Sequence, residues 1–166
     1  MPPIPFTPSK DQRLKAVQDI VYEYANLVSA GHFSLTGSAP WRTHCDDAFL
    51  LGCRKMDDFL MRKTRSNYAR KKEADDILAI DYLPDDLKIT WELPIWAKEW
   101  REPMNKQLAH LSYNRDKEWD HTIWVPQLIP EFKHAWGAFL DSILDPEYRA
   151  AFAEHLRLKR HIITQS

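Results

Sequence analysis

The residues best suited to chemistry lie in one short segment, Asn105–Arg115. His110 stands there between apolar neighbours of an expected helix, with Tyr113 and Arg115 within about one turn of it. An imidazole titrates near neutral pH and can act as a general acid or base, and an arginine can stabilise a phosphate as charge develops on it. The alternative is a half-buried histidine that hydrogen-bonds another helix and packs as a small aromatic side chain.

A metal site is the second kind of chemistry to consider. Three histidines, one from each of three expected helices, could meet in a bundle: His44, His110 and His134. Glu131 and His134 share a helix face, but a di-iron bundle needs two such Glu-x-x-His pairs. The chain has no HExxH or HxxxH pair, no glycine-rich phosphate loop and no GxSxG turn. We therefore expect no cofactor and keep the three-histidine site as an alternative.

The elements that would position these residues are helices. Ser9 and Gln12 form a capping-box pattern, and apolar residues at helical spacing follow until Gly31, where we expect the first helix to end. A second apolar stripe predicts a helix over residues 41–63. The short connection between the two stripes predicts an antiparallel pair.

Further helices follow in the second half of the chain, where no segment shows the two-residue alternation of a strand. We expect them at Ala74–Ile80, closed by Pro84, at Pro94–Tyr113, from Pro130 onward, and after the Asp145-Pro146 start signal. The sequence thus predicts an all-α fold, an up-and-down helical bundle of about five to six helices. Residues 1–8 are expected to form an extended arm and residues 9–162 a single domain.

Composition narrows the classes of function. A formal net charge of -1 argues against a general polyanion binder. No apolar run approaches the ~20 residues that span a bilayer, and the start of the chain lacks the pattern of a signal peptide. Cys45 and Cys53 would lie ~12 Å apart on one helix, too far for a disulfide. We therefore expect reduced thiols, a cytoplasmic location and no membrane contact.

Three segments, in this order along the chain, carry a family resemblance. They are Gly52–Leu60 on a helix, the acidic turn Ala74–Ala79, and Asn105–Arg115. Over about residues 45–140 this order resembles the HEPN superfamily of helical-bundle proteins from bacterial toxin, antiphage and RNA-processing systems. It more closely resembles a group of short bacterial proteins of unassigned function.

Active HEPN nucleases carry an arginine, four to six residues, and then a histidine, often with an asparagine directly after the arginine. His110 matches the histidine and Asn105 the asparagine, whereas the arginine position falls on Met104 or Asn105 at the usual spacing and on Pro103 at the longest. Arg101 lies farther upstream. Family members without the arginine tend to be noncatalytic modules that bind RNA or a partner.

The resemblance therefore implies a homodimer that binds RNA or a partner protein. It also implies an enzymatic possibility, metal-independent RNA cleavage in which His110 takes a proton from the ribose 2′-hydroxyl. Arg115 or Arg54 would stabilise the developing charge, and Tyr113 would orient the RNA backbone. The candidate binding residues around this centre are Arg54, Arg101 and Lys106.

An alternative function is a noncatalytic protein-interaction module. Seven tryptophans are many for 166 residues. Some of Trp41, Trp91, Trp119 and Trp124 are expected to lie in loops, outside the main helix stripes. Exposed aromatic side chains at such positions would mark an association surface.

Overall fold

The fold is known from a computed structural model that describes residues 7–38, 41–62, 76–84, 87, 91 and 121–164, with backbone alone at residues 121 and 161–164. The described residues contain helices and turns and no strand. In chain order the elements are α1 (Lys10–Thr36), α2 (Trp41–Met61), the 3-10 turn η2 (Ala79–Tyr82), α5 (His121–Ser142) and α6 (Pro146–Thr164). The all-α prediction is confirmed for this part of the chain, which holds four α-helices.

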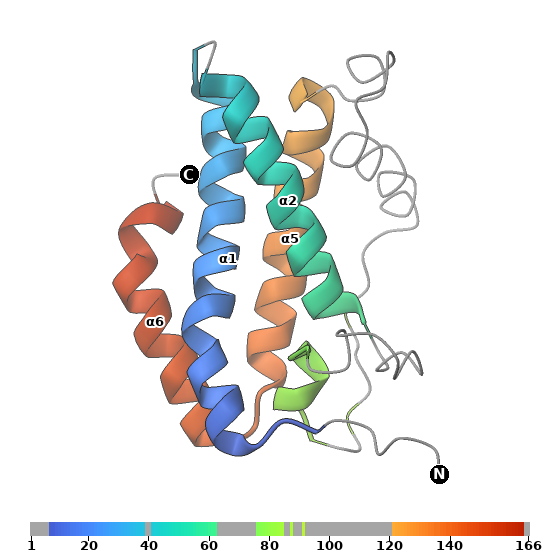
Figure 1. The fold of residues 1–166 in the computed structure, drawn as a ribbon, viewed down its shortest axis with the longest axis vertical. Coiled ribbons are helices and arrows are strands. Elements are labelled where there is room, and N and C mark those ends of the chain that lie inside the picture. The colour runs from blue at the N-terminus through green and yellow to red at the C-terminus, as the bar shows by residue number, and fades with distance from the viewer. Residues whose placement is uncertain are drawn as a thin grey trace.

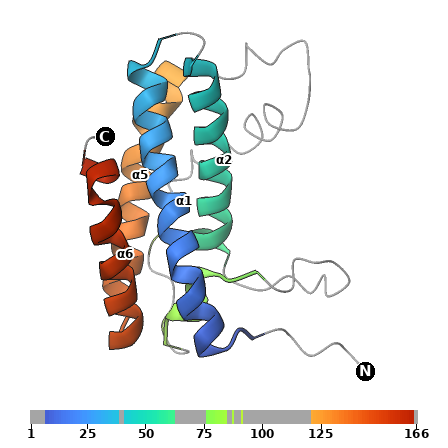
Figure 2. The same cartoon turned by 60° about the vertical axis from the view of Figure 1, so that its left-hand side comes forward.

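Helix α1 is the centre of the arrangement, because α2, α5 and α6 all pack against it (Figures 1 and 2). It forms an antiparallel hairpin with α2, as predicted, and α5 and α6 form a second one. The up-and-down order holds within each hairpin. Between the hairpins, α2 and α5 run in the same direction (Figure 1).

Helix α1 begins as predicted and ends later than predicted. The Ser9 hydroxyl accepts a hydrogen bond from the Gln12 amide at 3.2 Å, and the Ser9 amide donates to Gln12 Oε1 at 2.8 Å. The predicted end at Gly31 is wrong, since α1 continues to Thr36. Gly31 is buried, and a Cβ there would lie 3.0 Å from the Phe49 ring of α2. This glycine therefore serves helix packing rather than helix termination.

Helix α5 begins at His121, nine residues before the predicted start at Pro130. Both Pro126 and Pro130 lie inside it, four residues apart, on the same exposed face. Each proline lacks the amide hydrogen that would donate to the preceding turn, and on the exposed face its ring displaces no core side chain. The exposed face of α5 therefore tolerates both prolines, which its buried face would not.

The start of α6 agrees with the prediction, whereas the helix predicted before Pro84 does not. Asp145 caps α6 as predicted, its Oδ1 accepting from the Glu147 amide at 2.8 Å. The helix predicted over Ala74–Ile80 is wrong at residues 76–78, which are not helical, and η2 follows instead. Its Asp81 Oδ2 accepts from the Leu78 amide at 2.7 Å. The helix predicted over Pro94–Tyr113 lies outside the described residues.

Phe139 of α5 is the hub of the core. Its ring meets four other aromatic rings edge-on, with centroids 5.3 to 6.1 Å apart, and a fifth, on α5 itself, at a tilt. These rings belong to Phe59, Tyr82, Trp91, Trp136 and Phe152. Edge-to-face pairs add to the free energy of burial. One side chain thus joins α2, η2, α5, α6 and the segment around residue 91.

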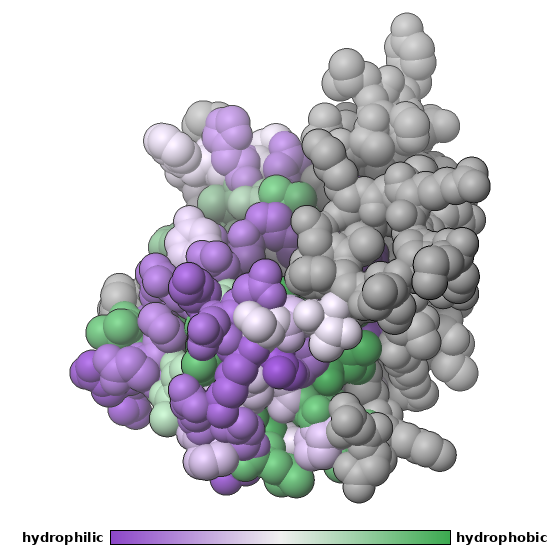
Figure 3. Space-filling view, turned by 60° about the horizontal axis from the view of Figure 1, so that its bottom comes forward, coloured by the Kyte–Doolittle hydropathy of each residue, from purple (hydrophilic) through white to green (hydrophobic). Residues whose placement is uncertain are grey.

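The lower end of the bundle in Figure 1, where α1 and α6 begin, is fixed by polar contacts. Lys10 Nζ lies 2.7 Å from Glu147 Oε2 and 3.1 Å from Asp145 Oδ2, and these carboxylates raise the pKa of Lys10. The Tyr82 hydroxyl donates to the Arg13 carbonyl at 2.7 Å. Seen from this end, hydrophilic residues gather on the described surface (Figure 3). Exposed ion pairs contribute little stability singly, so the core remains the main source of it.

Helices α1 and α2 approach most closely at Gly52. A Cβ there would lie 3.0 Å from the Leu27 Cβ and 3.1 Å from its Cα, and backbone cannot yield as a flexible side-chain end can. At Gly137 of α5, a Cβ would meet nothing within 4 Å. The two glycines therefore form a matched pair for testing the contact.

We expect Gly52→Ala to be less stable than Gly137→Ala by ~1–3 kcal/mol in free energy of unfolding. Both substitutions gain the same helix propensity, so their difference reports the clash with Leu27 alone. Urea unfolding of both variants measures it. Equal stability of the two would show that the hairpin does not depend on this close approach.

Candidate functional site

All four sequence-predicted catalytic residues lie outside the described residues. These are Asn105, His110, Tyr113 and Arg115, together with the binding candidates Arg101 and Lys106. The binding candidate Arg54 is described and lies exposed on α2. The RNA-cleaving centre therefore remains a prediction, and the structure adds only the position of Arg54.

The three-histidine metal site is described at two of its three positions. His44, in the first turn of α2, and His134, in α5, are both exposed, and the third position, His110, is outside the described residues. The His44 ring stands edge-on to Trp41 with centroids 6.2 Å apart. Within the part of the chain that the structure describes, no three His, Cys, Asp or Glu side chains are grouped to hold a metal ion.

The end of α1 and the start of α2 are joined by partly buried polar contacts that the sequence did not reveal. The hydroxyl of Ser34, which is fully buried, donates to the Asp46 carboxylate across the hairpin. The Arg42 guanidinium donates twice to the Gly37 carbonyl, at 2.9 and 3.2 Å. A buried hydrogen bond to a charged group is stronger than a neutral one. These contacts therefore join the end of α1 to the first turns of α2.

This fixed hairpin exposes large apolar side chains on the side turned away from α5. They are Tyr22 (48% exposed) and Phe33 (53%) on α1, and Trp41 (69%) and Leu51 (46%) on α2. Along α1, Tyr22, Asn26, Ser29 and Phe33 follow one another at helical spacing and share one stripe. We call the surface formed by these residues and Ala30, Ala48, Gly52 and Lys55 the hairpin face.

A shallow hollow of about 350 Å³ lies at the middle of the hairpin face. Its floor is made by small residues of both helices, Ser29, Ala30, Ala48 and Gly52. Leu51 and Tyr22 stand at its edge. At its lower end, Lys55 Nζ pairs with Glu23 Oε1 at 2.6 Å across the two helices. Large side chains around a floor of small ones make a surface that a packed helix or side chain can fill.

The hairpin face is poor in charge. No charged residue occurs from Tyr24 to Pro40, although 28% of the chain is charged and a stretch of that length would hold about five. The Glu23–Lys55 pair neutralises itself at the lower end of the hollow. Interfaces between proteins are depleted of charge in their centres and enriched in aromatic side chains, and the α1 part of this face has both properties. At the Tyr22 end, Lys159 of α6 places its Nζ 5.3 Å from the centroid of the Tyr22 ring.

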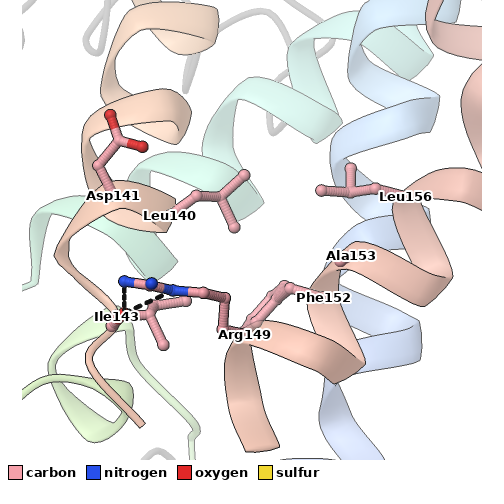
Figure 4. Close-up of a pocket in the computed structure, with 7 residues that line it drawn as sticks. All are labelled: Leu140, Asp141, Ile143, Arg149, Phe152, Ala153 and Leu156. Atoms are coloured by element: carbon pink, nitrogen blue, oxygen red, sulfur yellow. Dashed lines mark hydrogen bonds between the residues drawn. The ribbon is translucent and has the colours of Figure 1, made fainter. Parts of the chain in front are cut away.

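A second pocket, of about 360 Å³, lies between α5 and α6 (Figure 4). Its walls are mainly apolar, with Leu140, Phe152 and Leu156 facing one another across it. The Arg149 guanidinium at its rim donates to the Ile143 carbonyl at 2.6 and 3.2 Å. This arginine satisfies a carbonyl just beyond the end of α5, so its position has a structural explanation.

Three described side chains with shifted pKa values are held in their neutral forms. Burial, aided by the charge of Asp57, raises the pKa of the Cys53 thiol well above its usual value. Burial raises the pKa of Tyr24 to about 12 and that of Tyr82 further still. A general base or an activated nucleophile needs a pKa moved toward neutrality. None of these three groups can therefore act as one at neutral pH.

The tryptophans separate into structural and surface positions. Trp91 is 3% exposed, and its Nε1–H donates to the Leu60 carbonyl at 3.1 Å. Trp124 is half-buried against the core, Trp41 is exposed, and Trp119 lies outside the described residues. Of the tryptophans singled out in the sequence, Trp41 is thus the one that lies exposed on the hairpin face.

No family model, curated protein or solved structure matches the chain. Among the described helices, none is both long and apolar enough to cross a membrane. The hairpin face remains the described surface whose composition most clearly departs from that of an ordinary solvated helix pair.

We expect a thiol reagent to label Cys45 more than about tenfold faster than Cys53 in the folded protein. Cys45 is half-buried, whereas Cys53 is fully buried and its raised pKa keeps it a thiol, and only the thiolate reacts. Mass spectrometry of Cys45→Ser and Cys53→Ser variants gives the two rates separately. Comparable rates in native buffer, with equal rates in denaturant, would contradict the packing of α2 against the core.

Proposed function

We propose that the protein is a protein-binding module and that the hairpin face is its binding surface. The observation that carries the proposal is the exposure of Tyr22, Phe33, Trp41 and Leu51 on the α1–α2 pair, where Tyr22 and Leu51 also line the hollow. Each of these side chains exposes apolar surface to water. Burial of that surface against a partner would contribute ~25 cal/mol per Å² to the free energy of binding. Their placement on one surface points to an interface.

The hairpin face is also preorganised. The Ser34–Asp46 and Arg42–Gly37 contacts join the end of α1 to the start of α2, and the close approach at Gly52 sets the distance between the helices. Binding to a rigid surface loses less conformational entropy than binding to one that must first become ordered. A preformed hollow between two fixed helices therefore suits specific recognition of a partner protein.

A cytoplasmic location belongs to the same proposal. Both described cysteines are free, and Cys45 is half-buried whereas Cys53 lies in the core. Proteins that keep free thiols in their cores are typical of reducing compartments.

A photo-crosslinking amino acid placed at Phe33 tests the proposal. In cells of the source organism, we expect it to give a discrete adduct heavier than the chain itself. The same amino acid at Leu144, which is 62% exposed but far along the chain on the α5–α6 connection, is the control. A lack of adducts at Phe33, or the same set of adducts at both positions, would contradict a binding role for the hairpin face.

RNA binding of the HEPN kind is the second candidate function. Its support is the Asn105–Arg115 pattern in the sequence together with the exposure of Arg54 on α2, where a guanidinium can reach a phosphate. In this proposal RNA cleavage, where it occurs, is metal-independent. His110 takes the proton of a 2′-hydroxyl, whose oxygen attacks the adjacent phosphorus, and the 5′-oxygen leaves and takes a proton from water. Arg115 or Arg54 stabilises the charge on the phosphate, and Tyr113 orients the backbone.

Purified protein incubated with mixed RNA in a chelator, beside a His110→Ala variant, tests this candidate. We expect the wild-type protein to cleave and the variant to be slower by about a hundredfold or more, the size of a general-base contribution. Arg54→Ala should weaken RNA binding while Lys133→Ala, a half-buried cation on α5, should not. If both wild type and His110→Ala are inert, or both cleave equally, His110 has no catalytic role.

A further inference from the structure

A positive charge stands at the edge of the apolar pocket between α5 and α6 (Figure 4). Leu140 of α5 and Phe152 and Leu156 of α6 face one another across this pocket. The Arg149 side chain extends from α6 toward the end of α5. Sites for small molecules in proteins are concave and mainly apolar, with a few polar groups that orient the ligand. The pocket between α5 and α6 has this composition.

The Arg149 guanidinium keeps one edge free. Its Nε and Nη2 donate to the Ile143 carbonyl at 3.2 and 2.6 Å, which uses two of the five N–H groups of an arginine. Among the described residues, Arg149 forms no other hydrogen bond and no ion pair. The carbonyl therefore holds the guanidinium without neutralising its charge, and the edge formed by Nη1 and Nη2 remains available. Parallel N–H groups on such an edge match the two oxygens of a carboxylate.

Asp141 of α5 is the second charged residue of the pocket lining. Its carboxylate points away from Arg149, and these two side chains form no ion pair with each other (Figure 4). Asp141 therefore leaves the positive charge of Arg149 available to a ligand. One carboxylate on a ligand can pair with Arg149, whereas a second carboxylate near Asp141 would be repelled. The lining thus favours a ligand with a single acidic group.

The volume of the pocket sets the size of this ligand. The pocket measures about 360 Å³, whereas a cavity of ~150 Å³ holds one benzene molecule. An apolar body of two fused rings, with its acid group on a short chain, therefore suits the space. Ala153, a small and exposed residue of the lining, leaves the α6 side of the pocket open to such a body.

We propose that the pocket between α5 and α6 binds a small organic monocarboxylate with an apolar body of this size. The body lies between Leu140, Phe152 and Leu156, and the carboxylate pairs with the free edge of Arg149. The pocket shares no lining residue with the hollow on the hairpin face. This ligand site is therefore separate from the surface proposed to bind a protein.

A ligand in this pocket contacts the core of the folded bundle. The Phe152 ring, which forms part of the lining, stands edge-on to the rings of Phe139 and Trp136, with centroids 5.4 and 5.9 Å away. These rings come from two helices and meet only when α5 and α6 are folded together. A ligand that binds the folded state alone raises its stability. Thermal unfolding therefore reports binding independently of a titration.

Calorimetric titration of the full chain with naphthylacetate, and with its neutral amide naphthylacetamide, tests the inference. We expect the acid to bind with a Kd below ~1 mM and to raise the melting temperature. The amide should bind at least about fivefold more weakly, because a hydrogen bond between two charged groups is stronger than one to a neutral group.

Arg149→Gln separates the charge of the arginine from its structural contact. Glutamine keeps an N–H donor for the Ile143 carbonyl but carries no charge. This variant should lower the affinity for the acid to that for the amide and leave the affinity for the amide unchanged. Arg157→Gln, at an exposed arginine of α6 outside the pocket lining, is the matched control and should change neither affinity.

Two exposed alanines of α6 test where the apolar body lies. Ala153→Leu places a larger side chain in the pocket and should weaken the binding of both ligands by more than about tenfold. Ala150→Leu adds the same side chain at a position that does not line the pocket, so both affinities should stay at their wild-type values.

An acid that does not bind at millimolar concentration, or that binds no more tightly than its amide, would overturn the inference. An Arg149→Gln variant that binds the acid as the wild type does, or that loses both ligands, would show that the charge of Arg149 does not select the ligand. Equal effects of Ala153→Leu and Ala150→Leu would place the binding site elsewhere. The crosslinking experiment at Phe33 tests the hairpin face separately from all of these outcomes.

Discussion

The contact on which the described fold most depends is the close approach of α1 and α2. A Cβ on Gly52 would lie 3.1 Å from the Leu27 Cα, and a Cβ on Gly31 would lie 3.0 Å from the Phe49 ring. The two helices come this close because both positions are glycine. Helices this close leave small residues between them on the outer side as well, which is why the hairpin face has a hollow. The packing inside the bundle and the shape of its surface are therefore two results of one constraint.

Local signals in the sequence predicted where α1, α2 and α6 begin, but not where α5 begins or where α1 ends. Ser9 and Asp145 act through hydrogen bonds to residues two or three positions away, so their effect is visible without tertiary structure. Gly31 and Pro130 have strong local preferences, yet their neighbours in the fold decide their roles. A glycine can end a helix or admit a ring, and only the arrangement of the other helices shows which.

The candidate site was less predictable than the fold. Trp41 stands out in the sequence because tryptophan is rare and large. Phe33 and Leu51, which are also exposed, look like ordinary core residues in a helical pattern. Their exposure follows from which face α5 and α6 cover, a property of the assembled bundle. The lack of charge from Tyr24 to Pro40 was a readable signal, since a solvated helix end normally carries charge. The chemistry expected around His110 lies in a segment that the structure does not describe.

The pairing of the first and last helices has a consequence for biosynthesis. Helix α6 packs mainly on α1, and Lys10 reaches Asp145 across most of the chain's length. While a ribosome is still producing the middle of the chain, the flank of α1 that α6 will cover has no native neighbour. That apolar flank stays exposed on the nascent protein until α6 emerges. During this interval a chaperone would have a binding site on α1, and slow translation would raise the risk of aggregation.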